Sequence, residues 1–153
     1  MKDSKKNKKK RKNYGKYIVT GIIFVLIDQI SKQFFSNYER DFGFFAFTYV
    51  ENSGITFGFL QGYNWLVIAL SILSIGLLYY FKDEFKGKEW LLTLITAGII
   101  GNFLDRVLRG YVIDFINFKF WPVFNFADIY LVIGIVTFII LALKEDFQNS
   151  SKS

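Results

Sequence analysis

Four long blocks of apolar residues, separated by polar segments, dominate the chain. They cover residues 17–35, 65–81, 90–108 and 128–144. Each block is close to the roughly 20 residues that a helix needs to cross the hydrocarbon core of a bilayer, and the second and fourth lie near the short end of that range. Four such helices in one small chain leave too little polar surface to cover them. We therefore predict a mainly α, polytopic membrane protein that is built as a four-transmembrane-helix bundle.

The segment between the first two blocks, residues 36–64, has a different pattern. It is rich in aromatic and β-branched residues and is punctuated by glycine, which favours short strands. Turns are expected at residues 52–54 and 61–62. We predict a small extracytoplasmic β-sheet that lies on the outer membrane surface, and an irregular aromatic loop is the alternative.

Basic residues predict the orientation in the membrane. The net charge is +6, and most of the excess lies in residues 1–16, "MKDSKKNKKKRKNYGK". Lysines also occur in the connection 82–89 and in the tail 145–153, whereas residues 36–64 and 109–127 carry few basic residues. Because positively charged loops stay on the cytoplasmic side, both termini and the 82–89 connection are expected there. The first tail could also bind nucleic acid, but a membrane span follows it at once, so we interpret it as a topology and lipid-surface element.

The expected organisation has three parts. Residues 1–16 form a basic cytoplasmic tail, residues 17–144 form the four-helix membrane domain, and residues 145–153 form a second cytoplasmic tail. The membrane domain includes the outer β segment 36–64 and the outer loop 109–127.

Two absences narrow the chemistry. The chain contains no Cys and no His. Disulfides, thiol nucleophiles and thiolate metal sites are therefore excluded, and so are a Ser-His-Asp triad and a His-ligated zinc site. Any hydrolytic chemistry must use carboxylates, Lys, Ser, Thr or Tyr, and we expect no metal and no cofactor.

Ionisable residues inside membrane spans are rare and tend to mark function. Asp28 and Lys32 lie on one face of the first helix, where a structural ion pair is at least as reasonable as a catalytic role. They also interrupt the apolar run, which has no small-residue cleavage site, so we interpret this block as a retained helix and not as a cleaved signal peptide. In the third block, Asn102, Asp105 and Arg106 share one face. The Arg could hold carboxylates in place, and a purely structural cluster is the alternative.

Two more carboxylates, Asp114 and Asp128, bracket the aromatic stretch "DFINFKFWPVFNFAD". Asp128 could simply cap the fourth helix, as could Asn125, but Asp114 has no such explanation. Both aspartates are expected at the same depth on the outer side. Two carboxylates brought together share a proton, as in an aspartic protease, where one activates water and the other polarises the scissile carbonyl. Spacing alone leaves two alternatives open, a small proton- or cation-coupled membrane carrier and a scaffold in which the acids are structural.

Four stretches of the chain resemble the ordered motif blocks of the lipoprotein signal peptidase family, also called signal peptidase II. They are "DQISK" (28–32), "NSGITFG" (52–58), "GNFLDRVLRGYVIDFI" (101–116) and "FNFAD" (124–128). The resemblance runs from the first apolar block to the fourth and excludes the Lys-rich tail. It implies an aspartic endopeptidase of the bacterial cytoplasmic membrane. Such an enzyme removes the signal peptide from diacylglyceryl-modified prolipoproteins by cutting just before the lipidated Cys.

The resemblance also implies roles for single residues. The catalytic dyad falls on Asp114 and Asp128, near the outer face. Substrate-binding or supporting positions are Asn52, Gly54, Asn102, Asp105, Arg106, Asn125, Asp28 and Lys32. Ile55 and Thr56 depart from the family pattern, which has two Ala there, and could reshape the substrate cradle. The implied partners are the prolipoprotein and membrane lipid, with no nucleic acid, and one chain supplies both aspartates, so a monomer suffices.

The residues between the two aspartates have expected places too. Phe115, Phe118 and Trp121 suit an aromatic wall at the membrane interface. Lys119 stands in the middle of this aromatic stretch, and we expect its side chain to reach the lipid headgroups.

Overall fold

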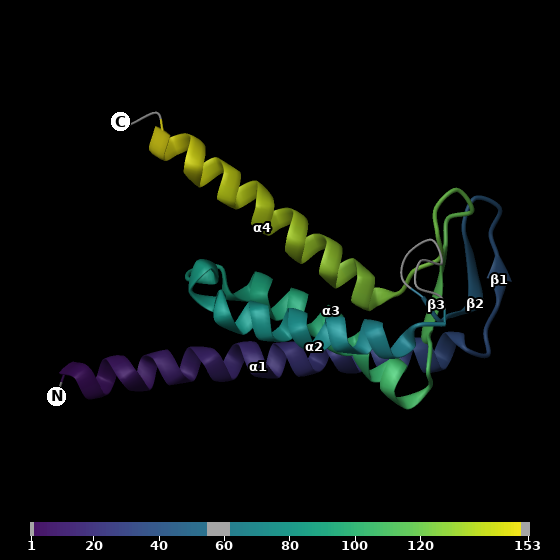
Figure 1. Ribbon diagram of the computed structural model, residues 1–153, viewed down its shortest axis with the longest axis horizontal. Helices are drawn as coiled ribbons and strands as arrows, with labels where there is room; N and C mark the ends of the chain where they lie inside the picture. Colours follow the sequence, from purple (N-terminus) through teal and green to yellow (C-terminus); the bar gives the residue numbers. More distant parts are fainter. Residues whose placement is uncertain (1, 55–61, 151–153) are drawn as a thin grey trace.

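A computed structural model describes residues 2–54 and 62–150 of the chain. The elements in chain order are α1 (Lys2–Phe35), β1 (Arg40–Asp41), β2 (Ala46–Asn52), α2 (Asn64–Tyr80), the 3-10 helix η2 (Lys82–Phe85), α3 (Glu89–Leu108), β3 (Val112–Asn117) and α4 (Phe126–Ser150). The helices extend from a small sheet at one end of the molecule (Figure 1). The start of α1, the 3-10 helix and the end of α4 lie at the opposite end.

The four apolar blocks are confirmed as helices. Three helices, α1, α3 and α4, are long and apolar enough to cross a membrane, and α2 is an apolar helix of 17 residues. The first and the last helix, α1 and α4, both extend past the expected boundaries. α1 begins at Lys2 and therefore includes the basic tail, since Lys and Arg are good helix formers. α4 continues to Ser150.

The sheet is antiparallel with strand order β1-β2-β3. Its third strand comes from the segment 109–127, so the prediction of a sheet within residues 36–64 was incomplete. In the register of β2 and β3, Val50 lies opposite Asp114 and Asn52 lies opposite Val112. This pairing brings Asn52 of β2 and Asp114 of β3, the two candidate site residues on these strands, to the same end of the sheet.

The predicted turns have different outcomes. The strand β2 ends at Asn52, and the side-chain oxygen Oδ1 of Asn52 accepts a hydrogen bond of 3.0 Å from the backbone N–H of Gly54, which confirms the first turn. In the second predicted turn, at residues 61–62, Gly62 has a positive φ of 84°. Gln61 lies outside the described residues, as do Ile55 and Thr56, so the predicted effect of those two on the cradle stays a prediction.

Aromatic stacking fixes the sheet on the end of α1. The ring of Phe35 stacks on Phe47 of β2, with ring centroids 4.3 Å apart, and on Phe115 of β3, with centroids 4.5 Å apart. Phe115 is fully buried. The last turn of α1 therefore determines where both strands lie.

Close helix packing in the bundle depends on glycines of α3. A Cβ atom added at Gly98 would lie 2.5 Å from the carbonyl oxygen of Ala127, and one added at Gly101 would lie 2.6 Å from a carboxylate oxygen of Asp28. Small residues let helix backbones approach closely. Both α1 and the start of α4 thus pack directly against α3, and their polar groups are brought to one level of the bundle.

Candidate active site

The N-terminus of α4 is capped by side chains from two parts of the chain. Asn125 accepts a hydrogen bond from the backbone N–H of Asp128 (3.0 Å), and Asp128 Oδ2 accepts one from the backbone N–H of Asn125 (3.1 Å). This reciprocal pair is a capping box. Asp28 of α1 accepts a third hydrogen bond, from the backbone N–H of Ala127 (2.9 Å). The predicted cap at this position is confirmed, and it leaves the second oxygen of Asp128 free for another contact.

Asp114 lies in β3 and is only 2% exposed. Its two oxygens each accept a hydrogen bond from an asparagine amide, Oδ2 from Asn52 (2.8 Å) and Oδ1 from Asn125 (2.6 Å). Burial, and then the nearby charge of Asp128, raise the pKa of Asp114 to about 7, although both hydrogen bonds and the charge of Lys32 act in the opposite direction. Asp114 therefore exchanges its proton near neutral pH.

Asp128 is linked to Asp114 through asparagines. Its Oδ1 accepts a hydrogen bond of 2.8 Å from the amide of Asn102, while Asn125 contacts both aspartates. Within the described residues, the hydrogen bonds to these two carboxylates come from Asn52, Asn102 and Asn125. The two acids thus belong to one hydrogen-bond network with neutral donors.

A cavity of about 710 Å³ opens onto this network. Its polar lining residues are Asn52, Ser71, Ser74, Asn102, Arg106, Asp114 and Asp128, and most of the remaining wall is apolar and comes from α2, α4 and the segment 121–124. Such a volume and a mostly apolar wall with a few converging polar groups are typical of a ligand site.

Arg106 lines the same cavity and is 8% exposed. Its guanidinium donates to the carbonyl oxygens of Gly54 (2.8 Å) and Asn102 (3.2 Å). Its Nε is buried and finds no hydrogen-bond partner among residues 2–54 and 62–150. Arg106 therefore holds the turn after β2 and places a positive charge near the two carboxylates.

A second polar cluster is buried behind the cavity. Lys32 Nζ lies 2.8 Å from Asp28 Oδ2 and 2.8 Å from Asp105 Oδ2, and all three side chains are inaccessible to solvent. Arg109 forms an ion pair with Asp105, and Gln29 donates to both carboxylates. The predicted ion pair of Asp28 and Lys32 is confirmed, as one part of a larger cluster.

The predicted site residues therefore divide into two groups. Six line the cavity or its network: Asn52, Asn102, Arg106, Asp114, Asn125 and Asp128. Asp28, Lys32 and Asp105 form the cluster behind it, and Gly54 is buried under Arg106. Sequence reasoning missed Gln29 and Arg109 of that cluster. Both stand inside the quoted motifs, next to the residues that were singled out.

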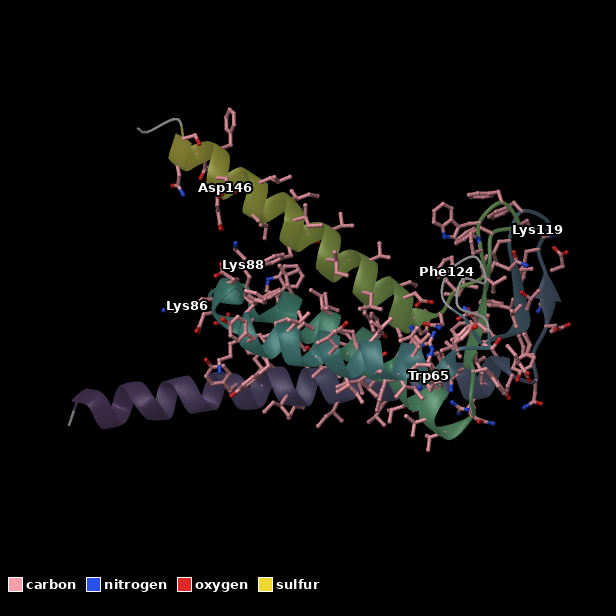
Figure 2. The ribbon with its side chains drawn as sticks, in the orientation of Figure 1. Trp65, Lys86, Lys88, Lys119, Phe124 and Asp146 are labelled. Atoms are coloured by element: carbon pink, nitrogen blue, oxygen red, sulfur yellow. The ribbon has the colours of Figure 1, made fainter. Side chains whose placement is uncertain are left out.

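The aromatic stretch differs from its prediction at two positions. Trp121 lines the cavity, but Phe115 is buried between the sheet and α1 and forms no wall. Lys119 was expected to reach the headgroups, but its ammonium contacts both carboxylate oxygens of Asp41 at 2.7 and 2.8 Å. Figure 2 shows Lys119 at the sheet end of the molecule, where this ion pair joins β1 to the connection that follows β3.

Comparison with known proteins gives a consistent result. Residues 20–144 match the family model described as Signal peptidase (SPase) II. The lipoprotein signal peptidase of Fusobacterium nucleatum is 40% identical over 139 residues, which cover 81% of this chain and 84% of that protein. The lipoprotein signal peptidase of Streptococcus agalactiae is 36% identical over 142 residues, with 84% and 92% covered.

Solved structures agree with the fold. One, described as a bacterial membrane enzyme, superposes with a TM-score of 0.78 at 31% identity and covers 88% of this chain and 91% of its own. A second of the same description gives 0.72 at 33% identity, with 84% and 92% covered. The fold and the polar cavity thus define a polytopic bacterial membrane enzyme. The match over residues 20–144 adds the particular assignment: the chain belongs to the signal peptidase II family, and it is a membrane peptidase.

Proposed function

We propose that this chain is an aspartic endopeptidase that removes signal peptides from diacylglyceryl-modified prolipoproteins and cuts just before the lipidated Cys, with Asp114 and Asp128 as its catalytic pair. The names of the relatives supply the substrate class. The observation that carries the mechanism is the joining of two carboxylates, through Asn125, at the wall of one cavity.

The two aspartates have different surroundings, which suggests different roles. Asp114 is almost completely buried, and its pKa of about 7 makes it the member that holds the shared proton. Asp128 is partly exposed and faces the cavity, where it can act on a water molecule. Asp128 takes a proton from this water as the water oxygen bonds to the scissile carbonyl carbon, while Asp114 gives its proton to the carbonyl oxygen.

The second half of the reaction restores both acids. The tetrahedral intermediate returns a proton to Asp114 as the carbonyl reforms and the C–N bond breaks. Asp128 passes the proton that it took from water to the leaving amine. The products are a carboxylic acid on the signal peptide, which then loses its proton to water, and a free amino group on the lipidated Cys, and no metal or cofactor enters the balance. Arg106 lines the same cavity, and its guanidinium is placed to bind a carbonyl of the substrate backbone.

The position of the site supports a substrate that is anchored by acyl chains. The cavity wall contributed by α2 and α4 contains Leu70, Val132 and Ile133, which are apolar and suit a segment that enters from the membrane. The site lies beside the sheet, at the end of the helices away from the lysines of the 82–89 connection, which Figure 2 shows at the opposite end. With those lysines in the cytoplasm, the site lies near the outer face.

The acids do not favour the carrier hypothesis. A carrier of protons or cations would place its acids near the middle of the bilayer, where the transported ion binds. Asp114 lies in a strand of the sheet at one end of the bundle, and Asp128 in the first turn of α4 beside it.

Cleavage assays on single variants test the proposal. Asp114→Asn and Asp128→Asn should each reduce cleavage of a diacylglyceryl-modified prolipoprotein by at least about 10⁴-fold, because neither amide can accept or hold the shared proton. Asp41→Asn, in which an exposed aspartate at the same end is changed, is the matched control and should cleave like the unmodified protein. An unlipidated substrate should be cut poorly by all of them. Full activity of both dyad variants, folded as judged by thermal melting, would refute the proposal.

A further inference from the structure

Each asparagine that donates to the two carboxylates has its own carbonyl oxygen held by a second donor. A side-chain amide has one accepting and one donating end, and its orientation follows from its partners. Asn52 Oδ1 accepts from the backbone N–H of Gly54, and Asn125 Oδ1 accepts from the backbone N–H of Asp128. The donating end of each amide is thereby directed to an aspartate.

Asn102 is held differently, by a charged side chain. Its Oδ1 accepts a hydrogen bond of 3.0 Å from the ammonium of Lys32, and also one of 3.1 Å from Asn125. If the amide turned over, its NH₂ group would face both of these donors and its oxygen would face the carboxylate of Asp128. An ammonium group only donates, so Lys32 requires the oxygen of Asn102 on its side.

Lys32 makes three short polar contacts. Lys32 Nζ forms ion pairs at 2.8 Å with Asp28 and with Asp105, and it donates a hydrogen bond of 3.0 Å to Asn102. Two of these partners are carboxylates, as in any buried ion pair. The third is a neutral amide whose other end contacts Asp128 at 2.8 Å. The Lys32 side chain is fully buried, so water does not compete for this contact.

We infer that Lys32 is a positioning residue for the reaction, in addition to its role in the ion cluster. It fixes the orientation of the Asn102 amide, and this amide holds the Asp128 carboxylate in the geometry that activates water. The inference rests on the proposed function of Asp128. Lys32 itself touches neither the cavity wall nor the two catalytic carboxylates within hydrogen-bond distance among the described residues.

The test compares kcat, KM and melting temperature in detergent with a lipidated substrate. Lys32→Met keeps an unbranched apolar side chain but removes all three donors. We expect its kcat to fall about 100-fold, as for other small misplacements of a catalytic group, with KM changed less than about 2-fold. The charge-balanced double variant Lys32→Met/Asp105→Asn removes one carboxylate along with the ammonium and should show the same loss of kcat.

Arg109→Gln is the matched control for a purely structural role. It removes another cation from the same cluster, the partner of Asp105, and does not touch Asn102. Its melting temperature should fall while kcat stays within about 2-fold of the unmodified enzyme, since a change that leaves the catalytic geometry intact has little effect on kcat. Asn102→Ala should lose at least as much kcat as Lys32→Met, because Lys32 acts through it.

Three outcomes would overturn the inference. One is a folded Lys32 variant, single or charge-balanced, that retains kcat within about 3-fold. Another is a greater loss in Lys32→Met than in Asn102→Ala. The third is failure of both Lys32 variants to fold, which would make Lys32 a stability residue only. Asp128→Asn in the same assay separates the two proposals: full activity of that variant refutes the proposed function, whereas an inactive Asp128→Asn beside an active Lys32→Met refutes the role of Lys32 alone.

Discussion

Removing the side chain of Asn52 should move the pH dependence of cleavage in a direction that the structure determines. Asn52 Nδ2 donates to Asp114 Oδ2 at 2.8 Å and favours the ionised carboxylate, so the Asn52→Ala change raises the pKa of Asp114 further above 7. A hydrogen bond to a charged group contributes about 1.5–3 kcal/mol, which corresponds to about one to two pH units. Because water can enter from the cavity and replace part of this hydrogen bond, we expect a shift of about one unit.

The sign follows from the proposed role of Asp114 as proton holder. Activity requires its protonated form, so kcat/KM should fall as the pH rises through its pKa, and this alkaline limb should lie about one unit higher in Asn52→Ala. The maximal rate of the variant falls as well, but the position of the limb is the informative quantity. The other charges that face Asp114 belong to Asp128, Arg106 and Lys32, and the change leaves them in place.

The assay is a profile of kcat/KM from about pH 5 to about pH 9 with a lipidated substrate, a range that spans the titration of Asp114. Tyr49→Phe is the control on the same strand, because the hydroxyl group of Tyr49 contacts Glu51 and Tyr111 and does not reach the network of Asp114. Its alkaline limb should coincide with that of the unmodified protein. A limb that stays in place, or moves to lower pH, in Asn52→Ala would show that Asp114 does not supply the proton.

Two further predictions concern stability. The pKa of Asp114 is raised from 3.8 to about 7, about three units or about 4 kcal/mol, so the folded state binds this proton more tightly and the protein loses stability as the pH rises across that window. The Asp114→Asn variant has no carboxyl group at this position, so it does not lose this stability as the pH rises. The melting temperature of the variant minus that of the unmodified protein should therefore increase between about pH 4 and pH 8. A difference in melting temperature that stays constant over this range contradicts the assignment. Gly98→Ala should lower the melting temperature by several degrees, because its Cβ would meet the backbone oxygen of Ala127. Gly76→Ala is the control: its Cβ would have nothing within 4 Å, so this variant should raise the melting temperature slightly. Equal effects of the two variants would argue against the close packing of α3 and α4.

The sequence predicts the parts of this molecule that depend on local pattern. The apolar blocks predict the helices because a helix hydrogen-bonds within itself and needs only length and composition to cross a membrane. The strand β3 was missed because all but the last of its residues, Val112–Asn117, are buried, so the alternation that marks a strand is absent. The ion pair of Asp28 and Lys32 was predicted from a spacing of one helical turn.

Contacts between distant segments could not be predicted from pattern. Asp28 caps a backbone N–H of α4 at a separation of 99 residues, and no local signal marks such a role. Lys119 was expected in the headgroups because its partner, Asp41, lies on a strand 78 residues away. The pairing of Asp114 with Asp128 was a hypothesis from spacing, and it became specific only through the resemblance of the motifs to a family. Their catalytic role is still a prediction.

The choice of asparagine around the two aspartates has an electrostatic reason. A cation about 4 Å from Asp114 would stabilise the ionised form by about 4 kcal/mol at an effective dielectric constant of about 20, or about three pH units. That is of the same size as the rise of the Asp114 pKa from 3.8 to about 7, so one Lys or Arg in direct contact would offset most of this rise and favour the ionised form. Amide donors hold the carboxylates without adding charge. Lys32 is accordingly kept behind Asn102, and the guanidinium of Arg106 is held by the carbonyl oxygens of Gly54 and Asn102. In the proposed mechanism, the site thus obtains both a fixed geometry and a proton that is exchangeable near neutral pH.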